Sequence, residues 1–162
     1  MTIKIGDQLP EATLTQKTAD GPKPVTTQEF FKGRTVALFA VPGAFTPTCS
    51  VRHLPGYKDN LSVLADKGVD AVACVAVNDA FVLGAWAEAN ELNGNDDITM
   101  LADGNGAFTK ALGLELDATG FGMGIRSKRY SMLVKDGVVE QLNVEEGGEF
   151  KVSAAEFLIE QL

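Results

Sequence analysis

Residues 35–50 read TVALFAVPGAFTPTCS, and this stretch decides the fold. Its first part, 35–41, is an apolar run of the kind that forms a buried strand. Thr46 is a favoured N-cap and Pro47 suits a first helical turn, so Cys49 is predicted to lie in the first turn of a helix. A strand therefore delivers a cysteine to the start of a helix.

The position of Cys49 favours a reactive thiol. Backbone N–H groups and the positive end of the helix dipole face a side chain in a first turn, and both stabilise a thiolate, which is the nucleophilic form of cysteine. The ordinary alternative is a small, buried and inert cysteine. A strand-to-helix elbow built from Pro, Gly and Thr favours the reactive interpretation.

The rest of the chain alternates strands and helices, which predicts an α/β fold with helices on both sides of a central mixed sheet. Residues 1–27 are consistent with an N-terminal β-hairpin. Further strands are expected at 69–77, 98–102, 130–134 and 138–143. Helices are expected from Thr26 or Thr27 to Phe31, at 57–66, 80–91 and 107–112, and at the C-terminus.

Local signals predict how several of these elements begin and end. Pro55 and Gly56 are expected to kink or break the helix that follows Cys49. The Asp-Gly pair in 135–137 indicates a hairpin turn, and 93–97 reads as a polar turn. Ser153 and Glu156 have the spacing of a capping box for the closing helix. Residues 113–124 have no clear period and read as an irregular loop with exposed Leu114.

Composition limits the classes of function. The 162 residues, 45% of them hydrophobic, suit one domain spanning 1–162. The net charge of −8 argues against nucleic-acid and anionic-membrane partners. No signal-peptide pattern or spanning apolar run is found, so a cytoplasmic location is expected. Two cysteines 25 positions apart and one histidine form no metal cluster, and no cofactor is expected.

The motif around Cys49 resembles a known family. Pro42, Thr46 and Cys49 fit the Pro-x-x-x-Thr-x-x-Cys signature of the peroxiredoxins, and VPGAFTPTCS followed by HLPGY is similar to their type II (fifth) branch. The resemblance continues through VACVAVNDAF at 72–81, LADGNGAF at 101–108 and RSKRYSMLVKDGVVEQLNVE at 126–145. It implies a thioredoxin-like fold, a thiol peroxidase acting on hydrogen peroxide and alkyl hydroperoxides, and a homodimer with 42–56 and 113–124 near the contact.

Peroxide reduction requires a nucleophile and donors for the charge that develops on the leaving oxygen. Cys49 is the predicted nucleophile. The hydroxyl of Thr46 either caps the helix or accepts a hydrogen bond beside the sulfur, and Pro42 is expected to shield the sulfur from water.

Arg129 is the predicted cation, because it opens the strand at 130–134 and so lies at the Cys49 edge of the proposed sheet. The resemblance supports this choice, since the active-site arginine of the family precedes such a strand. Arg126 and Lys128 remain alternatives.

Other residues are expected to border the substrate. His53, Leu116, Phe121 and Met123 are predicted to line the substrate pocket. His53, one helical turn after Cys49, also raises the alternative of a Cys–His hydrolase. A different alternative is a redox-silent binding module of thioredoxin-like fold, in which Cys49 is unreactive.

Cys74 falls within the apolar run 69–77, where a buried and inert thiol is expected. Some relatives carry a resolving cysteine near the C-terminus, and the corresponding segment NVEEGGEFKVSAAEF has none. A one-cysteine enzyme is therefore predicted, with glutathione and glutaredoxin, or thioredoxin, as the external reductant.

Overall fold

A computed structural model describes residues 1–92 and 97–162. The polar turn predicted at 93–97 lies outside the described residues except for Asp97. The strands are β1 (Thr13–Thr18), β2 (Gly21–Thr26), β3 (Thr35–Ala40), β4 (Ala71–Ala76), β5 (Thr99–Ala102), β6 (Glu115–Asp117), β7 (Ile125–Ser127), β8 (Tyr130–Lys135) and β9 (Val138–Val144). The helices are α1 (Thr27–Phe31), η1 (Cys49–His53), α2 (Leu54–Asp59), α3 (Leu61–Asp66), α4 (Ala80–Ala89), α5 (Ala107–Leu112), η2 (Thr119–Phe121) and α6 (Ala155–Glu160).

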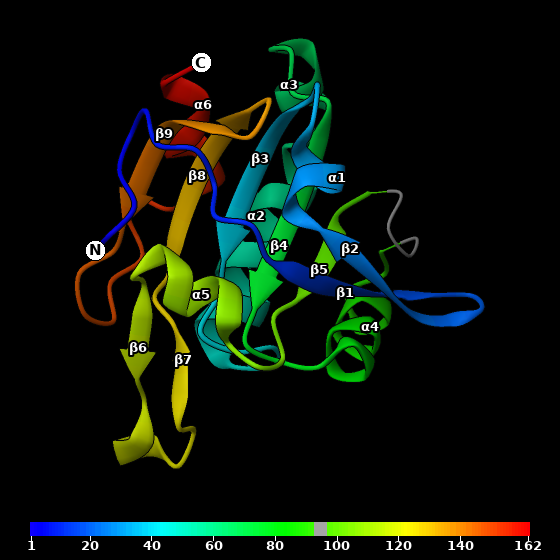
Figure 1. Ribbon diagram of the computed structural model, residues 1–162, viewed down its shortest axis with the longest axis vertical. Coiled ribbons are helices and arrows are strands. Elements are labelled where there is room, and N and C mark those ends of the chain that lie inside the picture. Colours follow the sequence, from blue (N-terminus) through cyan, green and yellow to red (C-terminus); the bar gives the residue numbers. More distant parts are fainter. Residues whose placement is uncertain (93–96) are drawn as a thin grey trace.

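One mixed sheet forms the centre of the molecule (Figure 1), with strand order β2-β1-β5-β4-β3-β8-β9. β3 pairs in parallel with β4, and β4 pairs in parallel with β5. β8 lies antiparallel to β3 on the other side. The predicted α/β class, the flanking helices and the N-terminal β-hairpin are confirmed.

The sheet separates two hydrophobic cores, because successive side chains of a strand point to opposite faces. On β3, Ala37 and Phe39 face the core formed with α2, α3, α4 and α6. Val36, Leu38 and Ala40 face the second core, which α1 and α5 cover. Both faces of β3 are thus buried, which explains its almost continuously apolar sequence.

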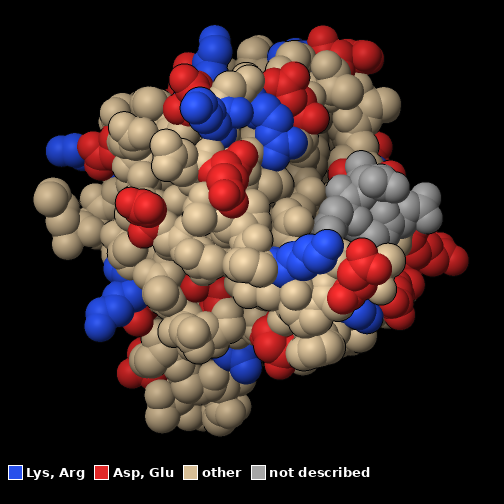
Figure 2. Space-filling view, turned by 45° about the vertical axis from the view of Figure 1, so that its right-hand side comes forward, with Lys and Arg blue, Asp and Glu red and all other residues tan. Residues whose placement is uncertain are grey.

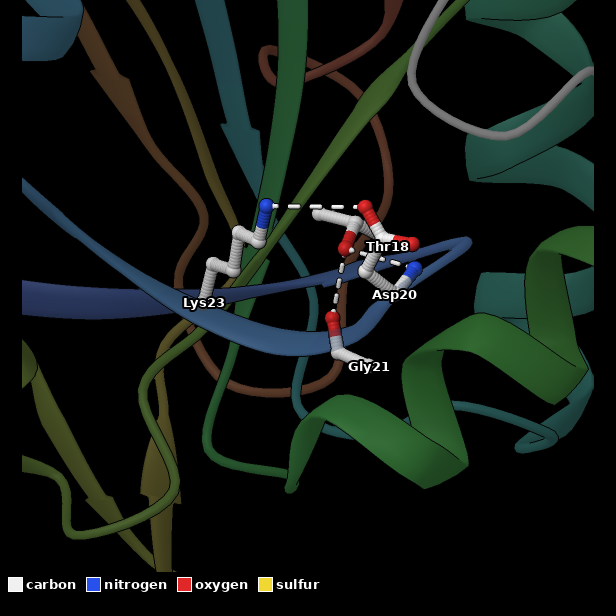
Figure 3. A network of polar contacts seen from close by, with 4 residues as sticks. All are labelled: Thr18, Asp20, Gly21 and Lys23. Carbon is white, nitrogen blue, oxygen red and sulfur yellow. Dashed lines mark hydrogen bonds and ion pairs between the residues drawn. The ribbon is translucent and has the colours of Figure 1, made fainter.

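The N-terminal hairpin closes through a small polar network (Figure 3). Thr18 Oγ1 donates to the Gly21 carbonyl at 2.6 Å and accepts from Asp20 N at 3.2 Å. Lys23 Nζ lies 3.7 Å from the Asp20 carboxylate. β1 also pairs with β5 through Thr15 and Ala102, so the hairpin is joined to the main sheet.

Two turn predictions are confirmed. Thr26 caps α1 in a full capping box, accepting from Glu29 N while the Glu29 carboxylate accepts from Thr26 N. Asp136 and Gly137 both have positive φ, 48° and 81°, as the tight turn between β8 and β9 requires.

Two other local predictions are not met. A break at Pro55 and Gly56 is absent, because the chain stays helical through both residues and α2 ends instead at Asp59. Ser153 does not cap α6: the N-cap is Ala154, without a side-chain bond, and the Ser153 hydroxyl donates to Glu145.

The segment 113–124 is not an irregular loop. It contains β6 and η2 and leads into β7, and the two strands form an antiparallel ribbon that projects from the body (Figure 1). Leu114 is buried rather than exposed. Strands of three residues are too short to show a period, so these two strands leave no periodic signal in the sequence.

Charges are mixed on the surface in view in Figure 2. Acidic and basic side chains are interspersed there with uncharged ones, so that face carries no extended basic patch. Within residues 1–92 and 97–162, no helix combines the length and apolar character needed to cross a bilayer.

Candidate active site

The elbow after β3 positions Cys49, whose side chain is fully buried. The helix opens with an ordinary bond from Ser50 N to the Thr46 carbonyl at 3.0 Å. It then widens into a π-turn over η1, where Leu54 N donates to the Cys49 carbonyl. A wide turn accommodates Pro55, which has no N–H and would crowd the carbonyl of an ordinary turn. The π-turn therefore keeps Cys49 and α2 on one continuous helix.

Arg129 lies beside the sulfur. Because β8 runs antiparallel to β3, with Tyr130 opposite Ala40, the start of β8 lies at the end of β3 that leads to Cys49. Arg129 Nη2 donates to Cys49 Sγ at 3.1 Å. Among the described residues, no carboxylate forms an ion pair with Arg129, so its charge is directed to the sulfur. This is the predicted placement, whereas its catalytic role stays a prediction.

His53 holds the other side of the guanidinium. Arg129 Nη1 lies 2.9 Å from His53 Nδ1, and His53 Nε2 lies 3.0 Å from the Ser153 carbonyl. Arginine can only donate and a carbonyl can only accept, so Nδ1 is the acceptor and Nε2 carries the proton. The ring is fully buried and does not line the surface groove, contrary to the predicted pocket-bordering position.

Burial keeps His53 neutral. Desolvation and the charge of Arg129 lower its pKa to about 3, against a smaller opposing effect of the bond to Ser153. In the unfolded chain the same ring takes up a proton near pH 6.5. The folded state therefore excludes a proton that the unfolded state binds, and His53 destabilises the fold as pH falls from about 6.5 toward 3.

This shift predicts an acid sensitivity that depends on His53. Between pH 7 and pH 5, His53 should lower the free energy of unfolding by about 2 kcal/mol. His53→Asn should lose that part of the pH dependence, even if its stability at pH 7 is lower. Urea unfolding of both proteins at the two pH values measures it, and equal pH dependences would contradict the prediction.

The Thr46 hydroxyl makes a hydrogen bond within the elbow. The Thr46 hydroxyl donates to the Gly43 carbonyl at 2.7 Å, and no side-chain bond to the helix is found among the described residues. Its proton is thereby engaged, so the oxygen can only accept from a further partner such as the O–H of a peroxide. Thr46 lies at the predicted N-cap position, directly before the first helical residue, Pro47, but its hydroxyl bonds Gly43 and makes no capping bond. The role of this hydroxyl toward substrate stays a prediction.

Arg126 supports the elbow rather than the sulfur. It donates to the Met123 carbonyl at 2.9 Å and to the Pro42 carbonyl at 3.4 Å. A side chain at Gly43 would come within 3.0 Å of the Arg126 guanidinium and 3.3 Å of the Met123 methyl group. Glycine at this position thus allows the β6–β7 ribbon to approach the elbow.

A groove of about 510 Å³ lies over Arg129. Its lining comes from the elbow, the ribbon and the segment after β9, namely Pro42, Leu116, Lys128, Arg129, Val144, Glu145, Glu146, Gly147 and Gly148. Leu116 lines this groove, whereas Met123 is not among its lining residues and lies against Gly43. The contact of either residue with substrate stays a prediction. Phe121 is not in the groove of its own chain: it is 86% exposed on the projecting ribbon.

A long-range hydrogen bond joins α4 to the Cys49 helix. Trp86 Nε1 donates to Ser50 Oγ at 2.9 Å, and the Trp86 ring is fully buried. Asp79 caps α4 by accepting from Val82 N, while the neighbouring Asn78 accepts from Ala44 N in the elbow. The loop after β4 and the helix it starts therefore both hold the elbow in place.

The geometry suits attack by a thiolate and does not suit a Cys–His hydrolase. Both His53 nitrogens are engaged elsewhere, and a ring with a pKa of about 3 is too weak a base to take a thiol proton at neutral pH. A guanidinium donating to the sulfur instead stabilises the thiolate directly.

Comparisons with known proteins agree with this chemistry. The Redoxin family model matches residues 4–159. Peroxiredoxin-2E-2, chloroplastic, of Oryza sativa subsp. japonica is 53% identical over 99% of this chain and 73% of its own length. Peroxiredoxin-2B of Arabidopsis thaliana is 42% identical, covering 99% and 98%. The structure of reduced Prx3 from Vibrio vulnificus in complex with H2O2 is 52% identical with a TM-score of 0.94, covering 99% of each chain.

These matches confirm the thioredoxin-like peroxiredoxin fold and the family suggested by the motif around Cys49. They do not support the two alternatives, a Cys–His hydrolase and a redox-silent binding module. The chain therefore belongs to the peroxiredoxins of the Redoxin family and is a thiol-dependent peroxidase.

Proposed function

We propose that this peroxidase uses Cys49 as its one catalytic cysteine and that an external thiol reduces it. The Cys49 thiolate attacks one oxygen of the peroxide, the O–O bond breaks, and the other oxygen leaves as water or alcohol after taking a proton. Cys49 is thereby oxidised to a sulfenic acid. Arg129, already donating to the sulfur, is placed to stabilise the charge on the leaving oxygen.

The environment of Cys74 carries the proposal. Cys74 is fully buried in β4, in the middle of the sheet and in register with Phe39 of β3. Burial raises the pKa of its thiol well above the ordinary value and the neighbouring Cys49 raises it further, against an opposing effect of Arg129. Cys74 therefore stays a thiol. Cys74 is also held on both sides by the pairing of β4 with β3 and β5, so we expect no disulfide between Cys74 and Cys49.

An external reductant follows from this. Glutathione with glutaredoxin, or thioredoxin, would attack the Cys49 sulfenic acid and release water, leaving a mixed disulfide that a second thiol reduces. Peroxide consumption, measured with each thiol system supplied alone, shows whether glutathione with glutaredoxin or thioredoxin is the reductant.

The one-cysteine proposal predicts the products of oxidation. Protein treated with peroxide alone should accumulate sulfenic acid and then over-oxidise, whereas added glutathione should give a mixed disulfide on Cys49. Cys74→Ser should turn over at the parental rate. Mass spectrometry under non-reducing conditions tests this, and an abundant crosslink from Cys49 to Cys74 within one chain, or loss of turnover in Cys74→Ser, would disprove it.

We also propose a homodimer that contacts through the elbow and the ribbon. Exposed apolar side chains gather in these segments: Phe45 is 57% exposed, Val51 73% and Phe121 86%. Exposed apolar clusters of this kind mark association surfaces. Such a contact would also explain how Phe121, which is outside the groove of its own chain, could reach a substrate.

A further inference from the structure

Glu145 is a buried carboxylate directly after β9, only 5% exposed. One of its oxygens, Oε2, accepts from Lys151 N at 2.6 Å, Ser153 N at 2.9 Å and Ser153 Oγ at 2.6 Å. Among the described residues, no lysine or arginine forms an ion pair with it. Burial alone would raise its pKa, but the hydrogen bonds from Ser153 and the neighbouring backbone outweigh burial and lower the pKa. The charge thus folds the segment 146–153 back onto the end of β9.

The same residue is attached to Arg129. Glu145 N donates to the Arg129 carbonyl at 3.0 Å, so the carboxylate starts from a backbone position fixed beside the arginine. The Glu145 carboxylate binds the N–H and the hydroxyl of Ser153 and so fixes the position of this residue. The Ser153 carbonyl in turn accepts from His53 Nε2 at 3.0 Å and from the Tyr57 hydroxyl at 3.1 Å. Two routes therefore lead from Glu145 back to the active-site arginine.

These hydrogen bonds form a chain that is linked through the covalent bonds of Ser153. It runs from Glu145 through Ser153 and His53 to Arg129, and ends at Cys49 Sγ. The Ser153 carbonyl matters most for the chemistry, because it accepts the only proton on the neutral imidazole and thereby forces Nδ1 to accept from Arg129. Without that carbonyl, the proton could move to Nδ1, which would then face the guanidinium as a second donor.

We propose that Glu145 is a positioning residue of the peroxidase: its carboxylate holds segment 146–153 so that the Ser153 carbonyl fixes the tautomer of His53 and thereby directs Arg129 at the Cys49 sulfur. Phe150, in the same segment, packs on this assembly. Its ring centroid lies 5.1 Å from that of His53 and 5.9 Å from the Arg129 guanidinium carbon. The proposal concerns the reaction with peroxide and does not depend on which thiol reduces Cys49.

Glu145→Gln tests the proposal, because an amide keeps the shape but loses the charge that gathers three donors. The variant should oxidise with peroxide roughly ten- to a hundredfold more slowly in a single turnover without reductant. Iodoacetamide should alkylate its Cys49 more slowly at neutral pH, since a misdirected guanidinium stabilises less thiolate. Glu149→Gln removes an equal charge from an exposed position in the same segment and should leave both rates unchanged.

The single histidine of the chain supplies a readout that a purely structural role would not move. In the parent protein, ¹⁵N NMR should show His53 with the proton on Nε2 only. In Glu145→Gln, the two nitrogen signals should move toward each other as the second tautomer appears. A folded Glu145→Gln protein with the parental tautomer, or with a parental rate of oxidation by peroxide, would overturn the proposal.

Ser153→Ala keeps the proposal testable if Glu145→Gln does not fold. It removes one of the three donors but retains the backbone carbonyl that His53 contacts. The oxidation rate should fall severalfold, with a smaller shift of the histidine signals in the same direction. Unchanged signals and an unchanged rate in Ser153→Ala would contradict the proposed route from Glu145 to Arg129.

Discussion

Cys49→Ser is expected to abolish peroxide reduction, with a loss of at least about a thousandfold. A serine hydroxyl occupies nearly the space of the thiol, so the buried elbow and the bond from Arg129 should persist. It is not ionised at neutral pH, however, and it is a far weaker nucleophile toward oxygen. The fold should remain intact while the chemistry is lost.

Peroxide consumption with an excess of reductant measures the loss, and circular dichroism checks the fold. Cys74→Ser is the matched control, because it makes the same atomic change at the other buried cysteine, in the same hydrophobic core. Residual turnover of Cys49→Ser above a few per cent of the parental rate would remove Cys49 from its assigned role.

Arg129→Lys is expected to slow the reaction with peroxide by about a hundredfold. The guanidinium donates to Cys49 Sγ and to His53 Nδ1 from two nitrogens of one rigid plane. The lysine side chain is shorter and carries one nitrogen in place of two, so its ammonium cannot contact both Cys49 and His53 in that geometry. The variant should therefore lose both the orientation of the donor and part of the stabilisation of the thiolate.

The control for this variant is Arg52→Lys. Arg52 stacks on the Phe150 ring with its guanidinium carbon 4.7 Å from the centroid, as Arg129 does at 5.9 Å. Arg52 is exposed and has no bond to the sulfur, so Arg52→Lys should react with peroxide within a factor of about two of the parental rate. Stopped-flow measurement of oxidation by peroxide distinguishes Arg129→Lys from Arg52→Lys. A parental rate in Arg129→Lys would transfer the role of the cation to Arg126 or Lys128.

The sequence predicts the strands that adjoin Cys49 and Arg129 but not the pairing of those strands. The apolar run at 35–41 and the Asp136–Gly137 turn are clear local signals, yet that turn joins β8 only to β9. Arg129 is therefore predicted from the proposed sheet order together with the resemblance to the peroxiredoxins, and Arg126 and Lys128 stay open. The antiparallel pairing of β8 with β3 explains why the Arg129 and Cys49 side chains meet.

The helix after Cys49 could not be predicted in this way. Pro55 ordinarily interrupts a helix, and the expectation of a break was reasonable on local grounds. The π-turn over η1 removes the conflict, but it depends on packing against the core and leaves no mark in the sequence. The free-energy cost of this irregular turn is offset by packing contacts with residues that are distant in the sequence.

The surroundings of His53 were missed for a related reason. Its partners are Arg129 and Ser153, which are 76 and 100 positions away. Ser153 carried a persuasive local signal, a capping box with Glu156, and that signal was false because Glu145 takes the hydroxyl instead. Buried polar networks combine residues from separate elements, so local motifs describe them poorly.

The hydrogen bond from Trp86 to Ser50 links the intrinsic fluorescence of the protein to the helix that carries Cys49. Trp86 is the chain's single tryptophan, so all indole fluorescence originates from one buried ring. That ring touches the residue next to Cys49. A rearrangement that breaks this bond is expected to change the polarity around the indole, so the emission of the unlabelled protein should report on the helix that carries Cys49.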